Sequence, residues 1–196
     1  MCQLFETIRI SAGEPQNLSL HDERMNRSRH ELFGNIDLIK LSDYITVPED
    51  AKDGIRRCRV IYTTYINSIE FLPYIPANIK TLKIVEADTL VYNYKYLDRS
   101  HLTSLIDKKA ADDVLIVRSG CLTDASYANI VFTDGQHWIT PDTPLLCGSM
   151  RELLLRKGVI KSARITLNDL PRFTHFRLIN AMLGNDAPLL PISNII

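Results

Sequence analysis

One lysine stands out because of its neighbours. Lys95 lies in the run Tyr-Asn-Tyr-Lys-Tyr, residues 92–96. Strands disfavour lysine, and the flanking tyrosines are typical of a packed extended segment. An amine held there is partly desolvated, which lowers its pKa and makes it a nucleophile. The alternative is an edge-strand lysine that keeps its charge in water. The residue types alone leave both interpretations open.

Two other groups of residues have side chains or backbone suited to an anionic ligand. His21, Arg24 and Ser28 are spaced three and four residues apart, which places them on one face of a helix. Taken alone, that face is expected to be a solvated polar face. Gly148 and Ser149 precede a helical sequence, and a helix N-terminus exposes backbone N–H groups that suit a phosphate. Many helices begin in this way without binding anything.

The elements that must position these residues follow from hydrophobic periodicity. Residues 3–11 alternate apolar and polar and predict a strand, and a helix is expected from about residue 20 to residue 33, ending at Gly34. Ser19 and Asp22 match a capping box at its start. A hairpin is predicted over residues 129–140, with Asp134-Gly135 at the turn. Further strands are expected over 56–67, 81–88, 92–96, 112–120 and 175–182, and further helices over 100–111 and 151–158.

Composition excludes several classes of protein. The 196 residues are 45% hydrophobic, and 23 basic residues balance 23 acidic ones, so there is no basic excess for a nucleic acid or a membrane surface. The N-terminus has neither a signal-peptide core nor a membrane span, so a cytoplasmic protein is expected. Cys2, Cys58, Cys121 and Cys147 form no CxxC pair. We therefore predict no metal site, and buried thiols rather than disulfides.

Five segments occur in the order that one enzyme family shows. Together they resemble the pyridoxal 5'-phosphate (PLP) enzymes of the class IV aminotransferase group, also called fold type IV. The resemblance implies a shortened α/β (α+β) fold, with a small N-terminal α/β domain over residues 1–91 and a larger, PLP-binding pseudobarrel domain over residues 92–196. The segments are Phe-Glu-Thr-Ile-Arg (5–9), His-Asp-Glu-Arg-Met-Asn-Arg-Ser (21–28), Tyr-Lys-Tyr-Leu-Asp-Arg (94–99), Leu-Thr-Asp-Ala-Ser-Tyr-Ala-Asn-Ile-Val-Phe (122–132) and Leu-Leu-Cys-Gly-Ser-Met-Arg (145–151).

The resemblance assigns a role to each motif. Lys95 corresponds to the lysine that forms the Schiff base with PLP and moves protons at the substrate α-carbon. Arg24 corresponds to the arginine that holds the cofactor phosphate, and Ser149 and Met150 lie in the turn that cradles it. Asp124 corresponds to the acid that faces the pyridine nitrogen. It replaces the usual glutamate and is one methylene shorter.

The C-terminal sequence resembles one subgroup. Residues 177–192, Arg-Leu-Ile-Asn-Ala-Met-Leu-Gly-Asn-Asp-Ala-Pro-Leu-Leu-Pro-Ile, are similar to the ending of aminodeoxychorismate lyases, and Asn180 and Ala181 would form a second phosphate turn. Such a lyase releases pyruvate and 4-aminobenzoate in the folate pathway. Thr7 and Arg9, which share a strand face with Phe5, are predicted to contact the substrate.

Three alternatives remain open at this stage. The first is a class IV aminotransferase acting on a D-amino or branched-chain amino acid. The second is a non-catalytic, degenerate PLP-fold protein, since roughly 25 residues that usually precede the first motif are absent (an estimate from typical domain sizes). The third is an unrelated α/β protein with chance motifs. The resemblance itself implies a small-molecule amino substrate and a homodimer.

Overall fold

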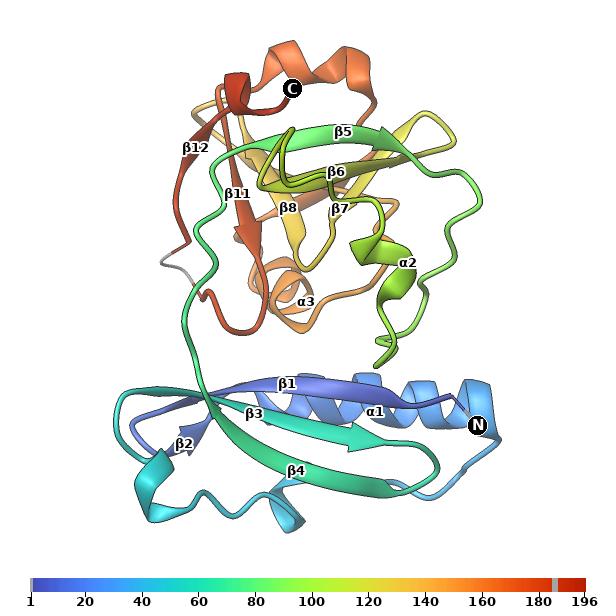
Figure 1. The fold of residues 1–196 in the computed structure, drawn as a ribbon, viewed down its shortest axis with the longest axis vertical. Coiled ribbons are helices and arrows are strands. Elements are labelled where there is room, and N and C mark those ends of the chain that lie inside the picture. Colours follow the sequence, from blue (N-terminus) through green and yellow to red (C-terminus); the bar gives the residue numbers. More distant parts are fainter. Residues whose placement is uncertain (1, 185–186) are drawn as a thin grey trace. The chain divides into compact units, whose positions relative to one another are not determined.

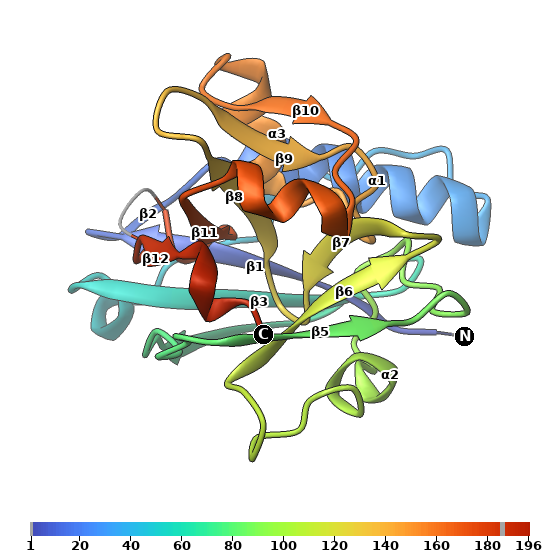
Figure 2. The ribbon, with the colours of Figure 1, turned by 90° about the horizontal axis from the view of Figure 1, so that it is seen from above.

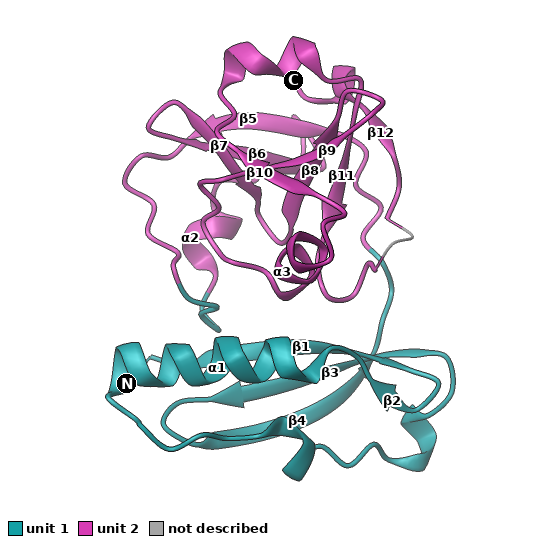
Figure 3. Cartoon of the chain, turned by 180° about the vertical axis from the view of Figure 1, so that it is seen from behind, with its two compact units in different colours: residues 1–76, 94–98 teal, residues 77–93, 99–196 magenta. Residues whose placement is uncertain are grey.

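The chain forms two compact units, which Figure 3 shows in teal and magenta. The computed structural model describes residues 2–184 and 187–196. Residues 1–76 and 94–98 make up the first unit, and residues 77–93 and 99–196 make up the second. Asn185 and Asp186, part of the lyase-like ending, lie outside the described residues. The domain boundary after residue 91 stays a prediction. The compact units divide earlier because β5 (Leu82–Glu86) pairs with a strand of the second unit.

The first unit is a four-stranded antiparallel sheet with one long helix (Figure 1). The strand order is β2-β1-β3-β4. Its elements are β1 (Leu4–Ser11), β2 (Glu14–Pro15), α1 (Leu18–Phe33), the 3₁₀ turns η1 (Leu41–Asp43) and η2 (Glu49–Ala51), β3 (Ile55–Tyr62) and β4 (Ile66–Pro73).

The helix α1 begins earlier than the capping pattern predicted. Asn17, in a left-handed conformation with φ 56°, is the N-cap, so the expected capping box of Ser19 and Asp22 is wrong. The reason is that the Asp22 carboxylate accepts a hydrogen bond from the backbone N–H of Leu41, 2.8 Å away. The predicted stop at Gly34 is confirmed. Gly34 has φ 71°, a conformation that glycine adopts without strain, and its N–H bonds to the carbonyls of the last helical turn.

Strand alternation places the core of the first unit between the sheet and α1. On β1 the buried residues Leu4, Ile8 and Ile10 point to one face, where they join Met25 of α1 and Val60 of β3. The spacing of two along the strand sends Phe5, Thr7 and Arg9 to the other face. The first strand is therefore confirmed, and its two faces have different environments.

The second unit contains two sheets with one eight-residue helix. The strand orders are β5-β6-β7 and β10-β9-β8-β11-β12. Figure 2 shows β10 beside β9, and these two strands run parallel. The elements after β5 are α2 (Ser100–Thr103), β6 (Asp113–Arg118), β7 (Cys121–Ala125), β8 (Asn129–Thr133), β9 (Trp138–Pro141), α3 (Ser149–Arg156), β10 (Lys161–Ala163), η3 (Leu167–Arg172), β11 (His175–Ile179), β12 (Leu190–Pro191) and η4 (Ile192–Asn194).

The core of the second unit lies around β6, β7 and β8. All five residues of β7 and all five of β8 are buried, as expected for strands covered on both faces. Phe132 of β8 stacks on Phe173 with 5.1 Å between ring centroids. The predicted turn at Asp134-Gly135 is confirmed as the connection between β8 and β9. A mixed α/β fold with few helices is thus confirmed.

Three expected elements are shorter than predicted. The strand expected over 56–67 ends as β3 at Tyr62, and Ile66 begins β4. Residues 92–96 form no strand; they make a single bridge between Leu4 and Tyr96. The helix expected over 100–111 ends as α2 after four residues. The Asp107 carboxylate accepts a hydrogen bond from the backbone N–H of Lys109, 3.0 Å away, and this local turn competes with helix continuation.

Candidate active site

A buried ionic cluster connects β1 to α1. Glu6 lies on the core face of β1, in the row of Leu4, Ile8 and Ile10, and is fully buried. Arg24 Nε donates to Glu6 Oε1 at 2.8 Å, and Arg24 Nη2 donates to Oε2. His21 Nδ1 lies 2.6 Å from the same Oε2. The helical face predicted to be solvated is therefore buried, with Arg24 only 6% exposed.

The charges in this cluster have a definite protonation pattern. Burial raises the pKa of Glu6, but the Arg24 guanidinium and the bonds from Arg24 and His21 outweigh it and lower the pKa to about 2. Burial lowers the pKa of His21, and Glu6 only partly opposes this effect. Arg24 and Lys95 lower it further. The cluster thus consists of a carboxylate, a guanidinium and a neutral imidazole at neutral pH.

Lys95 is held beside β1 by its own backbone. Its carbonyl accepts a hydrogen bond from the N–H of Phe5 at 3.0 Å. Its Nζ lies 4.5 Å from the centroid of the Phe5 ring, close enough for a cation–π contact when the amine is charged. Tyr94 and Tyr96 pack edge to face, 5.9 Å between centroids, against the core of the first unit. The lysine therefore sits half-buried on an aromatic support.

The predicted substrate residues lie on the opposite face of β1 from Glu6. Thr7 is directly across from Arg59 of β3, and Arg9 is directly across from Arg57. Arg59 forms an ion pair with Glu70 of β4 at 2.6 Å. Both residues of the Arg9–Arg57 pair are cationic, and like charges directly opposite on a sheet destabilise each other.

Tyr74 adds a hydroxyl to the Arg9–Arg57 pair. Burial raises the pKa of Tyr74, while Arg9 and Arg57 both act to lower it, which places the phenol within the field of both guanidinium groups. The Nε of Arg57 is buried without a protein hydrogen-bond partner among the described residues. This arrangement suits a carboxylate, which bonds well to arginine.

In the second unit, Asp124 of β7 is a buried acid with neutral neighbours. Its Oδ1 accepts a hydrogen bond from Asn129 Nδ2 at 2.7 Å, and its Oδ2 accepts one from the N–H of Leu146 at 3.0 Å. Burial raises the pKa of Asp124 to about 6, although these bonds, a backbone bond from Leu145 and the charge of Arg151 act to lower it.

The predicted phosphate turn begins helix α3. Gly148 is its N-cap, and Ser149 and Met150 are its first two residues. Both are buried. The Met150 side chain packs with Val131 and Ile179. Any contact of Met150 with a ligand would therefore have to come from its backbone. The phosphate contacts expected at this turn are made by backbone N–H groups in the first turn of α3.

The second predicted phosphate turn follows β11. The side-chain oxygen of Asn180 accepts hydrogen bonds from the N–H groups of Met182 at 2.9 Å and Leu183 at 3.0 Å. Ala181 lies between them and is half-buried. Asn180 therefore shapes this turn through its side chain, as asparagine commonly does in Asx turns.

The structure thus assembles the predicted residues into two groups. In the first unit Arg24 joins Glu6 and His21, and Lys95 lies against Phe5. In the second unit Asn129 connects Asp124 to residue 146, two residues before Gly148. Sequence reasoning missed Glu6 and Asn129. Glu6 had a signal, because it is a charged residue at an apolar position of the alternating pattern of β1.

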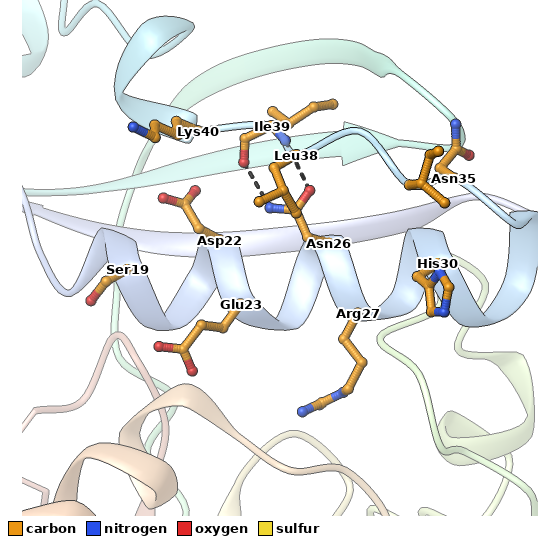
Figure 4. A pocket seen from close by; sticks show the side chains of 11 residues that line it. Ser19, Asp22, Glu23, Asn26, Arg27, His30, Asn35, Leu38, Ile39 and Lys40 are labelled. Carbon is orange, nitrogen blue, oxygen red and sulfur yellow. Dashed lines mark hydrogen bonds between the residues drawn. The ribbon is translucent and has the colours of Figure 1, made fainter.

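A hollow of about 660 Å³ lies on the outer side of α1 (Figure 4). Asp22, Asn26 and Leu38 are among the residues that line it, and two hydrogen bonds join Asn26 to the backbone of Ile39. None of the residues predicted to bind cofactor or substrate lines this hollow. It is therefore separate from the chemistry considered above.

The described residues also bear on membrane-spanning helices, metal sites and disulfides. No described helix has the length and apolar character to cross a membrane. No group of three or more His, Cys, Asp or Glu side chains in residues 2–184 and 187–196 is placed to hold a metal ion. The four cysteines, all of them described residues, form no disulfide bond. Cys58 and Cys121 are buried as expected, whereas Cys2 and Cys147 are exposed.

Comparisons with known proteins identify related chains. The model of the family "Amino-transferase class IV" matches residues 62–195. An uncharacterized protein of Haemophilus influenzae is 36% identical over 187 residues, which cover 94% of this chain and 100% of that protein.

Solved structures add two similar folds. A Haemophilus somnus protein provisionally assigned as a 4-amino-4-deoxychorismate lyase is 34% identical, with a TM-score of 0.86, covering 94% of this chain and 98% of that one. The PLP-bound form of a hypothetical aminotransferase from Mycobacterium tuberculosis has a TM-score of 0.76 at 17% identity, covering 96% of this chain and 80% of that one. At that identity the second likeness concerns the fold alone.

Proposed function

The chain belongs to the amino-transferase class IV family, and we propose that it is a PLP-dependent lyase that converts 4-amino-4-deoxychorismate into pyruvate and 4-aminobenzoate. The observation that carries the cofactor assignment is Asp124, a buried acid with a raised pKa and only neutral hydrogen-bond partners. A protonated pyridine nitrogen would give this carboxylate a cationic hydrogen-bond partner. The provisional assignment of the H. somnus protein supports the choice of reaction.

Asp124 and the start of α3, both in the second unit, fit the proposed cofactor. When bound, PLP supplies an electron sink for the substrate α-carbon. The Asp124 carboxylate would hold a proton at the pyridine nitrogen, and the N–H groups at the start of α3 would bind the phosphate. Asn180 and Ala181 would border the phosphate as a second turn. In this proposal Lys95 anchors the cofactor and afterwards moves protons at the substrate α-carbon.

Arg24 is oriented rather than mobile. Glu6 accepts hydrogen bonds from two of its three guanidinium nitrogens, and this fixes the plane of the fork. Arginine carries five N–H donors, and we propose that Arg24 also donates to the cofactor phosphate. Because the Glu6 carboxylate offsets the charge of Arg24, the strength of this contact would depend on how the N–H donors of Arg24 are directed.

The Arg9–Arg57 pair favours an acidic substrate. Aminodeoxychorismate carries two carboxylates, whereas a branched-chain amino acid carries only its α-carboxylate and an apolar side chain. We propose that Arg9, with Arg57 and Tyr74, binds a substrate carboxylate on the face of β1 that also carries Thr7 and Phe5. A D-amino or branched-chain aminotransferase would use the same lysine, so the substrate side of the site is what separates the reactions.

The function is tested by following pyruvate release from aminodeoxychorismate by the PLP-loaded protein. We expect pyruvate and 4-aminobenzoate in equal amounts, and no turnover by Lys95→Ala. Arg57→Leu should raise KM by about tenfold or more with a smaller change in kcat. Arg56→Leu, at the neighbouring position on the other face of β3, serves as the matched control. Amino transfer to a branched-chain keto acid without pyruvate release would contradict the lyase assignment.

We also propose that the protein is a cytoplasmic homodimer, as the family resemblance implies. Ile36 and Leu38 support a protein partner, because they are 87% and 79% exposed on the first unit. Sedimentation equilibrium measures the mass directly. A monomer at micromolar concentration would contradict the dimer.

A further inference from the structure

Asn129 occupies a position with several constraints. It is the first residue of β8 and only 6% exposed. Its Nδ2 donates one hydrogen bond to Asp124 Oδ1 at 2.7 Å and another to the carbonyl of Leu146 at 2.8 Å. An amide nitrogen has two hydrogens to donate, so both are in use. The side chain is therefore fixed at two points that are 22 residues apart in the sequence.

These bonds close into a ring. The N–H of Leu146 donates to Asp124 Oδ2 at 3.0 Å, so Asp124, Asn129 and the backbone of Leu146 each bond to the other two. Neither oxygen of the carboxylate can turn without breaking a bond. The ring holds the acid against the segment that leads directly into α3.

Gly148 is the other contact of Asn129. A Cβ added at Gly148 would lie 2.0 Å from Asn129 Oδ1 and 3.2 Å from its Cγ. The backbone of Gly148 has φ −72° and ψ 143°, which any residue adopts. A glycine is therefore required here by the close approach of Asn129, and not by the backbone conformation.

We propose that Asn129 is a positioning residue that fixes the spacing between Asp124 and the phosphate-binding turn at Gly148. The inference rests on the proposed function, because it takes Asp124 and the start of α3 as contacts for the two ends of PLP. The pyridine nitrogen and the phosphate belong to one small, largely rigid molecule, so their protein contacts must be held at a matching separation. The Asn129 side chain, which contacts both Asp124 and Gly148, holds them at a fixed separation.

The close approach is tested in the cofactor-free protein by a double-mutant cycle. Gly148→Ala alone should lower the melting temperature strongly, because Asn129 Oδ1 occupies the space of the new methyl group. In an Asn129→Ala background the same Gly148→Ala change should cost little, since the obstruction has gone. If Gly148→Ala alone does not fold, recovery of folded protein in the double variant is the expected result. Additive losses, or a double variant that stays unfolded, would overturn the inference.

A second measurement separates positioning from general stability. Asn129 donates to the Asp124 carboxylate, so Asn129→Ala should raise the pKa of Asp124 above its wild-type value. The other groups that act on this carboxylate are the backbone N–H groups of Leu145 and Leu146 and the charge of Arg151 on α3, and the substitution leaves them in place. The carboxyl ¹³C shift of Asp124 followed against pH reports this pKa without cofactor. Asn129→Ser serves instead if Asn129→Ala does not fold.

Asn26→Ala is the matched control. Asn26 also makes two side-chain hydrogen bonds to backbone, both to Ile39 in the first unit. Its loss should lower stability and leave the Asp124 titration unchanged. An Asp124 titration that is the same in Asn129→Ala and wild type would overturn the positioning role.

Equilibrium titration with PLP completes the test. Asn129→Ala should weaken PLP binding by about tenfold or more, as expected for losing a hydrogen bond to a charged group, and Asn26→Ala should not. Wild-type affinity in Asn129→Ala would contradict the inference. A wild-type protein that does not bind PLP at all would instead refute the proposed function, while the cycle and the Asp124 titration still test the ring itself.

Discussion

Two of the buried carboxylates in the described part of the chain, Glu6 and Asp124, have opposite electrostatic environments. Glu6, in the first unit, has a pKa lowered to about 2 because Arg24 and His21 bind both of its oxygens and outweigh its burial. Asp124, in the second unit, has a pKa raised to about 6 because burial outweighs the neutral donors of Asn129 and Leu146. The pKa values of these two buried acids thus shift in opposite directions. The charge of the hydrogen-bond donors decides the direction of each shift.

We propose that this difference separates a structural charge, Glu6, from a functional one, Asp124. Glu6 is ionised with its countercharge already present, so it orients Arg24 and contributes to folding. Asp124 is held in position by hydrogen bonds from neutral groups, the Asn129 side chain and the Leu146 backbone. A ligand with a protonated nitrogen would supply a cationic hydrogen-bond partner, and this is the role proposed for the pyridine ring.

The largest expected effect comes from removing Glu6. Glu6→Leu leaves the Arg24 guanidinium buried without its carboxylate, and breaking a buried pair in this way costs about 3–5 kcal/mol. Urea unfolding of the cofactor-free protein measures the loss. If Glu6→Leu were within about 1 kcal/mol of wild type, Glu6 would not be the structural charge described here.

The pH dependence of stability should differ for the two acids. Glu6 has a depressed pKa, so its contribution is present above pH 4.5 and is lost as pH falls toward about 2. Asp124 has a raised pKa, so its contribution is present below pH 3.8 and is lost as pH rises through about 6.

A comparison with Asp124→Asn isolates the contribution of Asp124 to the pH dependence of stability. The pKa of His21 is lowered, so its contribution is present above pH 6.5 and is lost as pH falls below it, which opposes the slope from Asp124. Subtracting the unfolding free energies of Asp124→Asn from those of wild type between pH 4 and pH 7 removes the His21 contribution. The difference should fall with rising pH, and saturating PLP should flatten it. A flat difference without PLP would contradict the raised pKa.

Cofactor affinity should depend on the charge of Asp124. Asp124→Asn keeps a similar shape but cannot carry the countercharge for a pyridinium, so PLP binding should weaken by about ten- to a hundredfold. Fluorescence or absorbance titration at pH 7.5 measures this. Thr123→Val, a change at the adjacent buried position whose hydroxyl bonds to the carbonyl of Ile116, is the control. Unchanged affinity in Asp124→Asn would remove the acid from the cofactor site.

The smallest expected effect concerns Glu70. Its ion pair with Arg59 is 2.6 Å long, but both side chains are more than a third exposed. Glu70→Gln should therefore change the unfolding free energy by about 1 kcal/mol or less, measured beside Glu6→Gln under the same conditions. A loss at Glu70 equal to that at Glu6 would show that burial does not distinguish these ion pairs.

Local sequence patterns predicted the elements that have strong local signals. The alternation of β1 and the stop of α1 at Gly34 were predictable, because strand period and glycine capping depend on a few neighbouring residues. The predicted capping box at Ser19 was wrong, since Leu41, far along the chain, takes the Asp22 carboxylate. The run at 92–96 looked like a strand from its tyrosines, but it pairs with β1 through a single bridge.

The candidate site shows the same limit. Family motifs located Lys95, Arg24 and Asp124 by position, and their roles remain predictions. Local patterns gave no indication that Asn129 bonds to Leu146, because that contact depends on how the chain returns past β8. Glu6 was recognisable in principle as a charge among apolar positions. Its partners on α1 were visible only once the helix was packed against the sheet.

The proposed function depends above all on the anchoring of PLP by Lys95. The most direct test incubates the purified protein with PLP, reduces it with borohydride and maps the modified peptide by mass spectrometry, with Lys95→Arg treated in parallel. We predict one pyridoxyl adduct per chain on Lys95 and none in Lys95→Arg. An adduct spread over surface lysines, or equal labelling of both proteins, would contradict the account.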